Sequence, residues 1–341
     1  MFQWRIEQER KLVEEEEKWI VALANNVDDL FENGGGDAKC LVVSGESVRK
    51  QHGLVLLSGG KKYAGADKTT EIYDYRNNSI KEGPPMNIPR EQHASVSLPN
   101  GDVAVFGGFS DEKEPHCLSS CEVLGVEKSV FCYVGDMLER RSSPTAVLLN
   151  NGLVLIIGGY AAGREPPLVT CEFYNPIDRK FYPSKATTNF RVLWRTASLL
   201  PDGTVILCGG GGGHRVEFGF TEFYDPVSDS FLYSRTAMIH RRREHAAARL
   251  LDGRIMLVGD HDHAAYSTEF YDPVEDKFTL GPNIDYWLNN SFAVCLPNGR
   301  VFIGIGTNTG RRTRIYDPLT NSFKKGKRLL YEREWGSGTL Y

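Results

Sequence analysis

Short aliphatic runs recur along most of the chain, and each is followed by one or two glycines. In residues 94–108, two such runs flank an Asn-Gly pair, and the second run ends at Gly107–Gly108. An Asn-Gly or Asp-Gly pair between apolar runs predicts a β-hairpin with a type I′ turn, whose central residues need a positive φ. The Val, Ile and Leu run before the glycines predicts a buried strand. This landmark falls on Gly59, Gly107, Gly158, Gly209, Gly259 and, in a weaker sixth copy, Ile305.

A second landmark follows each of these positions and combines a charged residue, an apolar residue, Tyr, Asp or Asn, and often Pro. The proline cannot continue a hydrogen-bonded ladder, so this segment ends a third strand. A large apolar residue nine positions after the start of the landmark marks a fourth strand. The second landmark begins at Glu71, Glu122 (a degenerate copy), Glu172, Glu222, Glu269 and Arg314. The steps between the glycine landmarks, as differences of residue numbers, are 48, 51, 51, 50 and 46 residues. Four strands repeated at this period predict the blades of a β-propeller, and six copies predict six blades.

Glycine doublets followed by Tyr-Asp and then a large aromatic residue, at this period, resemble Kelch repeats over about residues 40–341. We therefore expect an all-β, six-bladed Kelch-type propeller. Its ring is expected to close where residues 335–341 pair with the strand 54–58, which would remove free edges. A truncated piece of a longer, seven-bladed protein is the rival interpretation, and the apolar segment 40–43 has no assigned place. The resemblance implies that the loops after the glycines and the loops between blades meet on one face, around an axial channel.

The first 32 residues differ from the repeats. Four Lys and Arg against nine Asp and Glu give them a charge of −5, and apolar residues recur every seven positions at Ile6, Val13, Ile20 and Val27. This pattern predicts an amphipathic helix with an imperfect seam. We expect residues 1–37 to form this helix and a Gly-rich linker, and residues 38–341 to form the propeller. The helix either packs on the propeller or forms a loose coiled coil, or it docks a partner through residues 1–32.

The composition excludes several classes of protein. The net charge of −4 and a hydrophobic content of 41% argue against wholesale disorder and against a general attraction to nucleic acid or membranes. Neither a secretory signal peptide nor an apolar run of about 18 residues is recognisable. The seven cysteines are expected to be free thiols in a reducing compartment, so a cytoplasmic location is predicted.

Arginine is concentrated in the loops that the resemblance assigns to one face, although the chain as a whole is acidic. Arginine pairs with carboxylates and, together with aromatic residues, suits interface hot spots. We therefore predict that this face binds an acidic peptide or loop of a protein partner, as an adaptor or a structural subunit. The predicted binding residues are Arg90, Arg141, Arg164, Arg195, Arg215, Arg242, Tyr286, Trp287, Arg311 and Arg333. The loops also carry Arg140, Arg191, Arg241 and Arg243. The alternative for Arg90, Arg141 and Arg242 is that they brace neighbouring blades, since they share one repeat position.

A histidine cluster is a weaker candidate for a metal site. His261 and His263 follow Asp260, which stands where the repeat has glycine. Histidines near carboxylates can bind Zn or Fe. However, His93 and His245 share one repeat position, which favours a structural role for His245. No metal and no cofactor is predicted.

Known enzymes with Kelch propellers offer three comparisons. Galactose-oxidase-like enzymes use copper with Tyr and His, but this chain has no Tyr-His dipeptide and no room for their further domain. The Glu-x3-Asp-x3-His iron motif of nitrile-specifier-like proteins is absent. Mutarotases that act on sialic acid are six-bladed and would use Arg and Glu in the channel. They are exported, and the expected lack of a signal peptide counts against this option, but the Arg-rich loops leave it open. No catalytic residue is predicted and a non-catalytic chain is expected; a mutarotase or isomerase acting on a sugar acid is the alternative.

Overall fold

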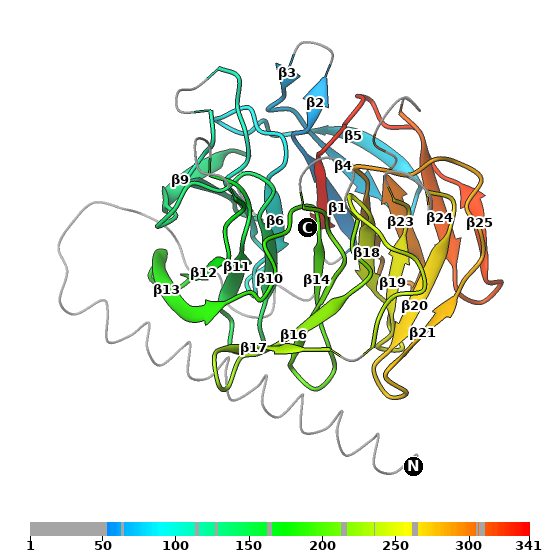
Figure 1. Cartoon of the computed structure of the whole chain (residues 1–341). Helices are drawn as coiled ribbons and strands as arrows, with labels where there is room; N and C mark the ends of the chain where they lie inside the picture. The colour runs from blue at the N-terminus through cyan, green and yellow to red at the C-terminus, as the bar shows by residue number, and fades with distance from the viewer. Residues whose placement is uncertain are drawn as a thin grey trace. The chain divides into compact units, whose positions relative to one another are not determined.

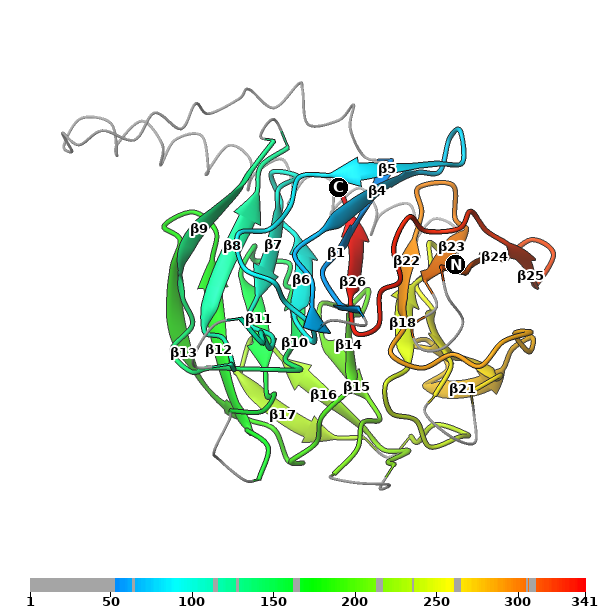
Figure 2. The same ribbon diagram turned by 90° about the horizontal axis from the view of Figure 1, so that it is seen from above.

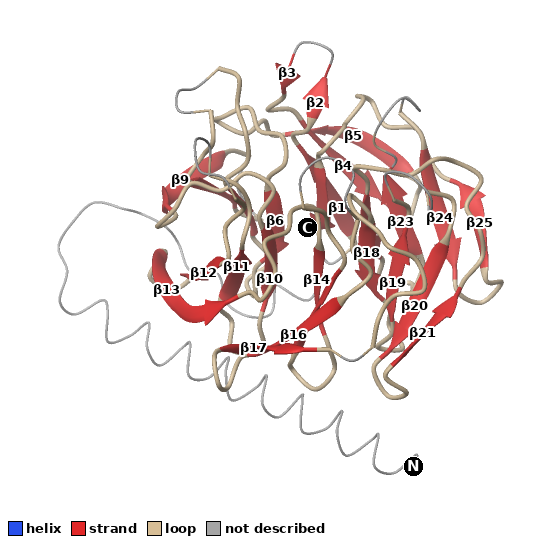
Figure 3. Ribbon diagram, viewed as in Figure 1, coloured by secondary structure: helices blue, strands red, loops and turns tan. Residues whose placement is uncertain are grey.

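The computed structural model describes residues 53–62, 65–112, 116–126, 129–161, 166–212, 217–234, 236–260, 265–304, 306 and 311–341. The expected helix, its linker and segment 40–43 lie outside these residues. Within the described ranges the chain contains strands and loops and no helix (Figure 3). This confirms the expected all-β fold.

Six four-stranded antiparallel sheets form the blades, numbered here along the chain and given from the inner strand outward. Blade 1 contains β26 (Ser337–Leu340), β1 (Leu54–Ser58), β4 (Thr70–Asp74) and β5 (Ser79–Gly83). Blade 2 contains β6 (Ala94–Ser97), β7 (Val103–Phe106), β8 (Ser120–Leu124) and β9 (Phe131–Asp136). Blade 3 contains β10 (Thr145–Leu148), β11 (Val154–Ile157), β12 (Thr170–Asn175) and β13 (Lys180–Thr187). Blade 4 contains β14 (Thr196–Leu199), β15 (Val205–Cys208), β16 (Thr221–Asp225) and β17 (Ser230–Tyr233). Blade 5 contains β18 (Ala246–Arg249), β19 (Ile255–Val258), β20 (Thr268–Asp272) and β21 (Lys277–Leu280). Blade 6 contains β22 (Phe292–Cys295), β23 (Val301–Gly304), β24 (Thr313–Asp317) and β25 (Ser322–Lys325). A small ribbon of β2 (Lys61–Lys62) and β3 (Gly65–Ala66) extends from blade 1.

The inner strands neighbour one another around a ring, and Figure 1 shows β6, β10, β14 and β18 nearest its middle. The last strand of the chain closes this ring. β26 pairs with β1 in antiparallel register, from Val55 opposite Leu340 to Ser58 opposite Ser337, and Figure 2 shows the two strands side by side. The predicted closure is confirmed, and it leaves no inner strand without a partner.

Two sets of loops meet on one face of the ring, as the resemblance implied. In four blades, a residue of the loop that enters the blade forms an isolated bridge with a residue just beyond the glycines of the same blade. The bridged pairs are Lys61–Glu334, Glu91–Phe109, Ser142–Tyr160 and Leu193–Gly211. Glycine is required for this approach, because a Cβ on Gly108 would lie 2.7 Å from the carbonyl oxygen of Glu91 in the entering loop of the same blade. The glycines therefore bring the two loops together.

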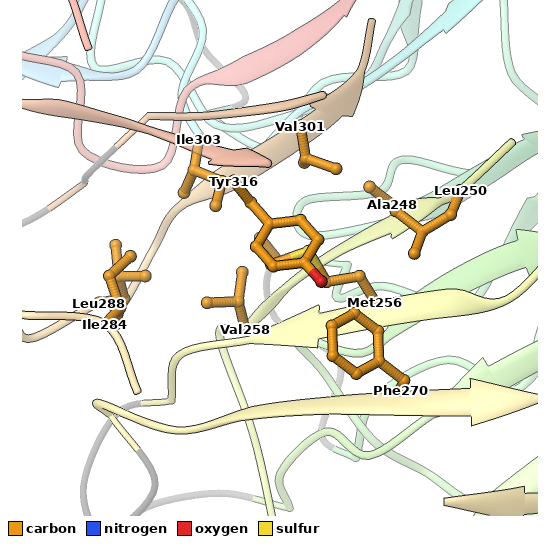
Figure 4. Packing of buried hydrophobic residues seen from close by; sticks show 11 residues of the cluster. Ala248, Leu250, Met256, Val258, Phe270, Ile284, Leu288, Val301, Ile303 and Tyr316 are labelled. Atoms are coloured by element: carbon orange, nitrogen blue, oxygen red, sulfur yellow. The ribbon is translucent and has the colours of Figure 1, made fainter. Parts of the chain in front are cut away.

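The hydrophobic core lies between the blades. Each of the six clusters of buried residues combines side chains from two neighbouring blades. Figure 4 shows the cluster between blades 5 and 6, where Met256 and Phe270 of one blade meet Ile303 and Tyr316 of the next. The second strand of each blade is covered on both faces, which explains its continuous apolar run.

The turns on the opposite face contain the Asn-Gly and Asp-Gly pairs of the repeat and the partners of its tyrosine. The Asn-Gly and Asp-Gly hairpins are present, but only their glycines, such as Gly101 with φ of 85°, have positive φ. The expected type I′ turn is therefore wrong, and a three-residue loop ending in a left-handed glycine takes its place. The tyrosine of the second landmark is held by the next turn: Tyr224 donates to Asp229 at 2.9 Å, and Tyr316 donates to Asn321 at 2.9 Å.

Candidate ligand-binding site

Six loop residues surround the axis where the chain enters the inner strand of each blade. All six have a left-handed backbone, with φ between 49° and 58°. They are Gln92, Ser143, Trp194, Glu244, Asn290 and Trp335, one from each blade. A left-handed conformation is uncommon for residues other than Gly, Asn and Asp, and such conformations cluster at functional sites. Because the repeat imposes the backbone, the side chain at this position is what differs among the blades.

These residues and their successors in the sequence line a pocket of about 130 Å³ on the axis. The successors are His93, Pro144, Arg195, His245, Ser291 and Gly336. Each blade thus contributes two consecutive residues to the wall. The pocket is small for a ligand site, and such a volume suits a small polar molecule rather than a peptide.

Several polar atoms of this wall are buried and have no hydrogen-bond partner in the part of the chain that the structure describes. Three of them can only donate: Trp194 Nε1, Trp335 Nε1 and Nη2 of Arg195. The others are Asn290 Oδ1, Ser291 Oγ and the Nδ1 atoms of His93 and His245. A buried polar group without a partner costs about 1–3 kcal/mol. Bound water or a ligand is therefore needed to satisfy them.

The two histidines of the wall are neutral at physiological pH. Burial lowers the pKa of His93 to about 3, and the positive charges of Arg90 and Arg333 add to this effect. Burial, with Arg242, likewise lowers the pKa of His245 to about 3. His93 Nε2 lies 3.0 Å from Ser58 Oγ, and His245 Nε2 lies 2.9 Å from Thr196 Oγ1. Both rings therefore serve as neutral hydrogen-bonding groups.

A buried carboxyl group lies in the loop beside the pocket. Burial raises the pKa of Glu91 to about 7; Lys61 opposes this shift, and Asp111 and Glu334 add to it. Burial also raises the pKa of Glu334, whose Oε1 accepts a hydrogen bond from Asn290 at 3.2 Å. Two carboxyl groups with raised pKa values thus interact with the positive charge of Lys61 in β2.

Four of the predicted binding arginines lie inside the blades. Arg90, Arg141, Arg242 and Arg333 are at most 1% exposed, and each forms an ion pair with the glutamate of its blade's second landmark. Arg90 is typical: it donates to Glu122, to the carbonyl oxygens of Gly107 and Ser120, and to Ser120 Oγ. This burial corrects the expectation that these guanidinium groups lie open on the loop face. They brace the loops that enter the blades.

The ion pair has a different arrangement in the two remaining blades, blade 4 and blade 6. In blade 4, Val192 takes the place of the buried arginine, and Arg195, three residues later, pairs with Glu222 at 2.8 Å. This leaves Arg195 beside the pocket. In blade 6, Leu288 takes the place of the buried arginine, and Arg314 stands at the glutamate position and pairs with Asp285 at 2.6 Å. Asp285 is 59% exposed, so this pair differs from the buried pairs of the other blades.

The other predicted residues have different locations. Trp287 is 43% exposed and Arg311 is exposed. The guanidinium carbons of Arg312 and Arg314 lie 4.7 and 4.4 Å from the ring centre of Tyr286. None of the three lines the axial pocket. Arg164, Arg215, His261 and His263 lie outside the described residues, so their roles stay predictions.

Sequence reasoning missed most of the pocket residues. Trp194, Glu244, Asn290 and Trp335 were not singled out, because no two of them form a motif along the chain. An alignment of the six repeats would have grouped them, since each lies two positions before the first residue of an inner strand. The closed ring brings the pocket residues together around the axis, although Gln92 and Trp335 are 243 positions apart in the sequence.

The comparisons with known proteins support this architecture. No protein-family model matches the chain. One stretch is 28% identical over 120 residues to galactose oxidase of Gibberella zeae, which is 33% of this chain and 18% of that protein. The solved structure titled "Structure of YjhT" matches with a TM-score of 0.63 and 11% identity, over 75% of this chain and 89% of that one. The chain is a Kelch-repeat β-propeller.

The similarity to galactose oxidase corrects one expectation about this Kelch propeller. A purely non-catalytic chain was expected, but the curated relative is named as an enzyme. The chain spans about a fifth of the length of that relative, and the likeness to YjhT shows the fold alone. Among the described residues, no helix is long and apolar enough to cross a membrane.

The pocket of this Kelch propeller does not fit the copper that galactose-oxidase-like enzymes use. In the described ranges, no group of three or more His, Cys, Asp and Glu side chains is arranged to hold a metal ion. The two histidines of the pocket belong to blades 2 and 5, on opposite sides of the ring, and no tyrosine lines the wall. Copper chemistry is therefore not assigned to this pocket.

Proposed function

We propose that the axial pocket binds a sugar acid and catalyses the interconversion of its ring anomers, as a mutarotase does. The observation that carries this proposal is the composition of the wall. It combines three groups that can only donate, Trp194, Arg195 and Trp335, with the carboxyl group of Glu244. The donors suit a carboxylate and sugar hydroxyl oxygens, and a carboxylate at the same wall suits proton transfer.

The proposed reaction requires only proton transfers and the opening and closing of the sugar ring. Glu244 would take the proton of the anomeric hydroxyl as the bond between the anomeric carbon and the ring oxygen breaks. The electron pair of that bond stays on the ring oxygen, which takes a proton from a water molecule and leaves hydroxide. Rotation about the single bond next to the new carbonyl carbon exposes its other face. The ring then closes: the hydroxyl oxygen attacks the carbonyl carbon and returns its proton to the hydroxide, and Glu244 returns its proton to the carbonyl oxygen, which gives the other anomer. The guanidinium of Arg195, held by Glu222, would bind the carboxylate of the substrate.

The comparisons support a sugar as the ligand class. The curated relative is named for an oxidase of galactose, a hexose. Mutarotases that act on sialic acid are also six-bladed propellers, so this fold is compatible with the reaction. The pocket's lack of a copper-binding set favours proton transfer over oxidation.

Exchange spectroscopy by NMR tests this function directly. The purified chain is mixed with N-acetylneuraminate, galacturonate or galactose, and the rate of exchange between the two anomers is measured. We expect faster exchange for the two acids than in buffer alone, with a smaller effect on neutral galactose. Exchange at the buffer rate with both acids would contradict the proposal.

The binding of an acidic peptide on the loop face is a second candidate function, in which the chain acts as an adaptor or a structural subunit. The observation in its favour is that Arg140, Arg191, Arg241 and Arg311 are exposed in loops of that face. An exposed arginine cluster attracts acidic segments in a salt-dependent way.

A titration with a Glu-rich peptide tests this second candidate. The variant with these four arginines changed to Gln should bind the peptide about tenfold more weakly. A control with Lys324 and Lys325 changed to Gln, on the outer strand β25, should bind as the wild type does. Equal affinities for both variants would count against the loop face.

A further inference from the structure

Two tryptophans occupy the same left-handed position on opposite sides of the axial pocket. Trp194 belongs to blade 4 and Trp335 to blade 1, three blades apart in a ring of six. Their φ values are 58° and 53°. Asn290 shows that the position accepts a residue for which this backbone is favourable, so a bulky aromatic residue carries a local cost.

Each indole has a cation against its ring. Lys61 Nζ lies 5.3 Å from the ring centre of Trp335, and Arg243 Cζ lies 5.8 Å from that of Trp194. Arg243 in turn lies 3.7 Å from a carboxylate oxygen of Glu217. Such a contact contributes about 0.5–1 kcal/mol at an exposed site, which is small enough for a bound ligand to overcome. The two tryptophans are therefore held in similar surroundings although they come from different blades.

Both indole N–H groups are buried and have no acceptor among the described residues. A tryptophan in a core usually finds a partner for this group or is replaced by phenylalanine, which has no donor to satisfy. Trp194 and Trp335 each combine an unfavourable backbone conformation with an indole N–H that has no acceptor among the described residues. The indole nitrogen therefore does not stabilise the fold at either position. The nitrogen is thus explained by a molecule that enters the pocket.

We propose that Trp194 and Trp335 are the ligand-positioning pair of the axial pocket, whose indole N–H groups donate to acceptor oxygens at two sides of a bound sugar acid. The proposal rests on the proposed function and names the groups that determine its specificity. Because both nitrogens are buried, a ligand reaches them when the indole side chains rotate toward it, as interface side chains commonly do on binding. The pair then selects ligands with acceptor oxygens on opposite edges, such as a carboxylate and a ring hydroxyl.

Replacement of each tryptophan by phenylalanine tests the pair, because Phe keeps the ring and removes the donor. We expect Trp194→Phe and Trp335→Phe each to weaken the binding of galacturonate about tenfold, as measured by titration calorimetry. Tyr233→Phe is the control: it removes a donor from an aromatic residue that is 67% exposed on the outer strand β17 and outside the pocket, and it should leave affinity unchanged.

Thermal melting of the free proteins separates ligand positioning from a structural role. Removal of an unsatisfied donor should leave the melting temperature of Trp194→Phe and Trp335→Phe unchanged or higher, whereas a structural role would lower it. The fluorescence change on adding galacturonate should shrink in both variants and persist in Tyr233→Phe. Wild-type affinity in both variants would overturn the positioning pair and leave the proposed function standing. If wild type itself binds no sugar acid, both proposals fail.

Discussion

Replacing Arg141 by methionine is expected to lower the free energy of unfolding by about 3–5 kcal/mol. The side chain is 1% exposed and pairs with Glu172 at 2.7 Å, and it donates to the carbonyl oxygens of Gly158 and Thr170. Without the arginine, Glu172 would be a buried charge with no compensating cation. Urea unfolding followed by circular dichroism measures the change.

The neighbouring residue supplies the control for this prediction. Arg140 lies in the same loop but is exposed, so Arg140→Met should change stability by no more than about 0.5 kcal/mol. The double variant Arg141→Met/Glu172→Met should be less destabilised than Arg141→Met alone, because it removes the unpaired charge. Equal stability of the two single variants would show that the buried pair does not brace the blade.

Replacing Glu244 by glutamine is expected to slow anomer exchange by about 100-fold or more, because Gln keeps the size of the side chain but cannot take a proton. The affinity for galacturonate should change much less than the rate. Exchange NMR at saturating galacturonate gives the rate, and calorimetry gives the affinity. The control is Glu275→Gln, an exposed glutamate in the turn between β20 and β21. An unchanged rate in Glu244→Gln would remove Glu244 from the mechanism.

The fold was largely predictable because its signals are local and repeated six times. The Asn-Gly hairpins, the buried runs and the tyrosines each report on their own blade, and six agreeing copies identify the architecture. Even the closure of the ring by residues 335–341 followed from an unpaired inner strand at each end of the repeat series. The type of hairpin turn was wrong, since the dihedral angle of one residue in each turn depends on how the flanking strands pair.

The candidate site was less predictable, because arginines alike in sequence have opposite surroundings. Arg140 and Arg141 are adjacent, yet one is exposed and the other is among the most buried side chains of the described chain. Arg195 was expected to bind a partner, and the structure shows it paired with Glu222 at the pocket wall. The buried glutamates that pair with Arg90, Arg141, Arg195 and Arg242 are 27 to 32 positions away along the chain, so no local pattern reveals these pairs.

The sequence by itself determined the blades, since the period, the turn glycines and the buried runs express short-range preferences of the backbone. Only the tertiary structure decided which arginines are buried and which residues form the pocket. Gln92 and Trp335 meet at one wall because the ring closes and the glycine loops let six inter-blade loops converge on the axis. Burial and convergence arise from contacts between distant segments, and the chemistry of the pocket depends on both.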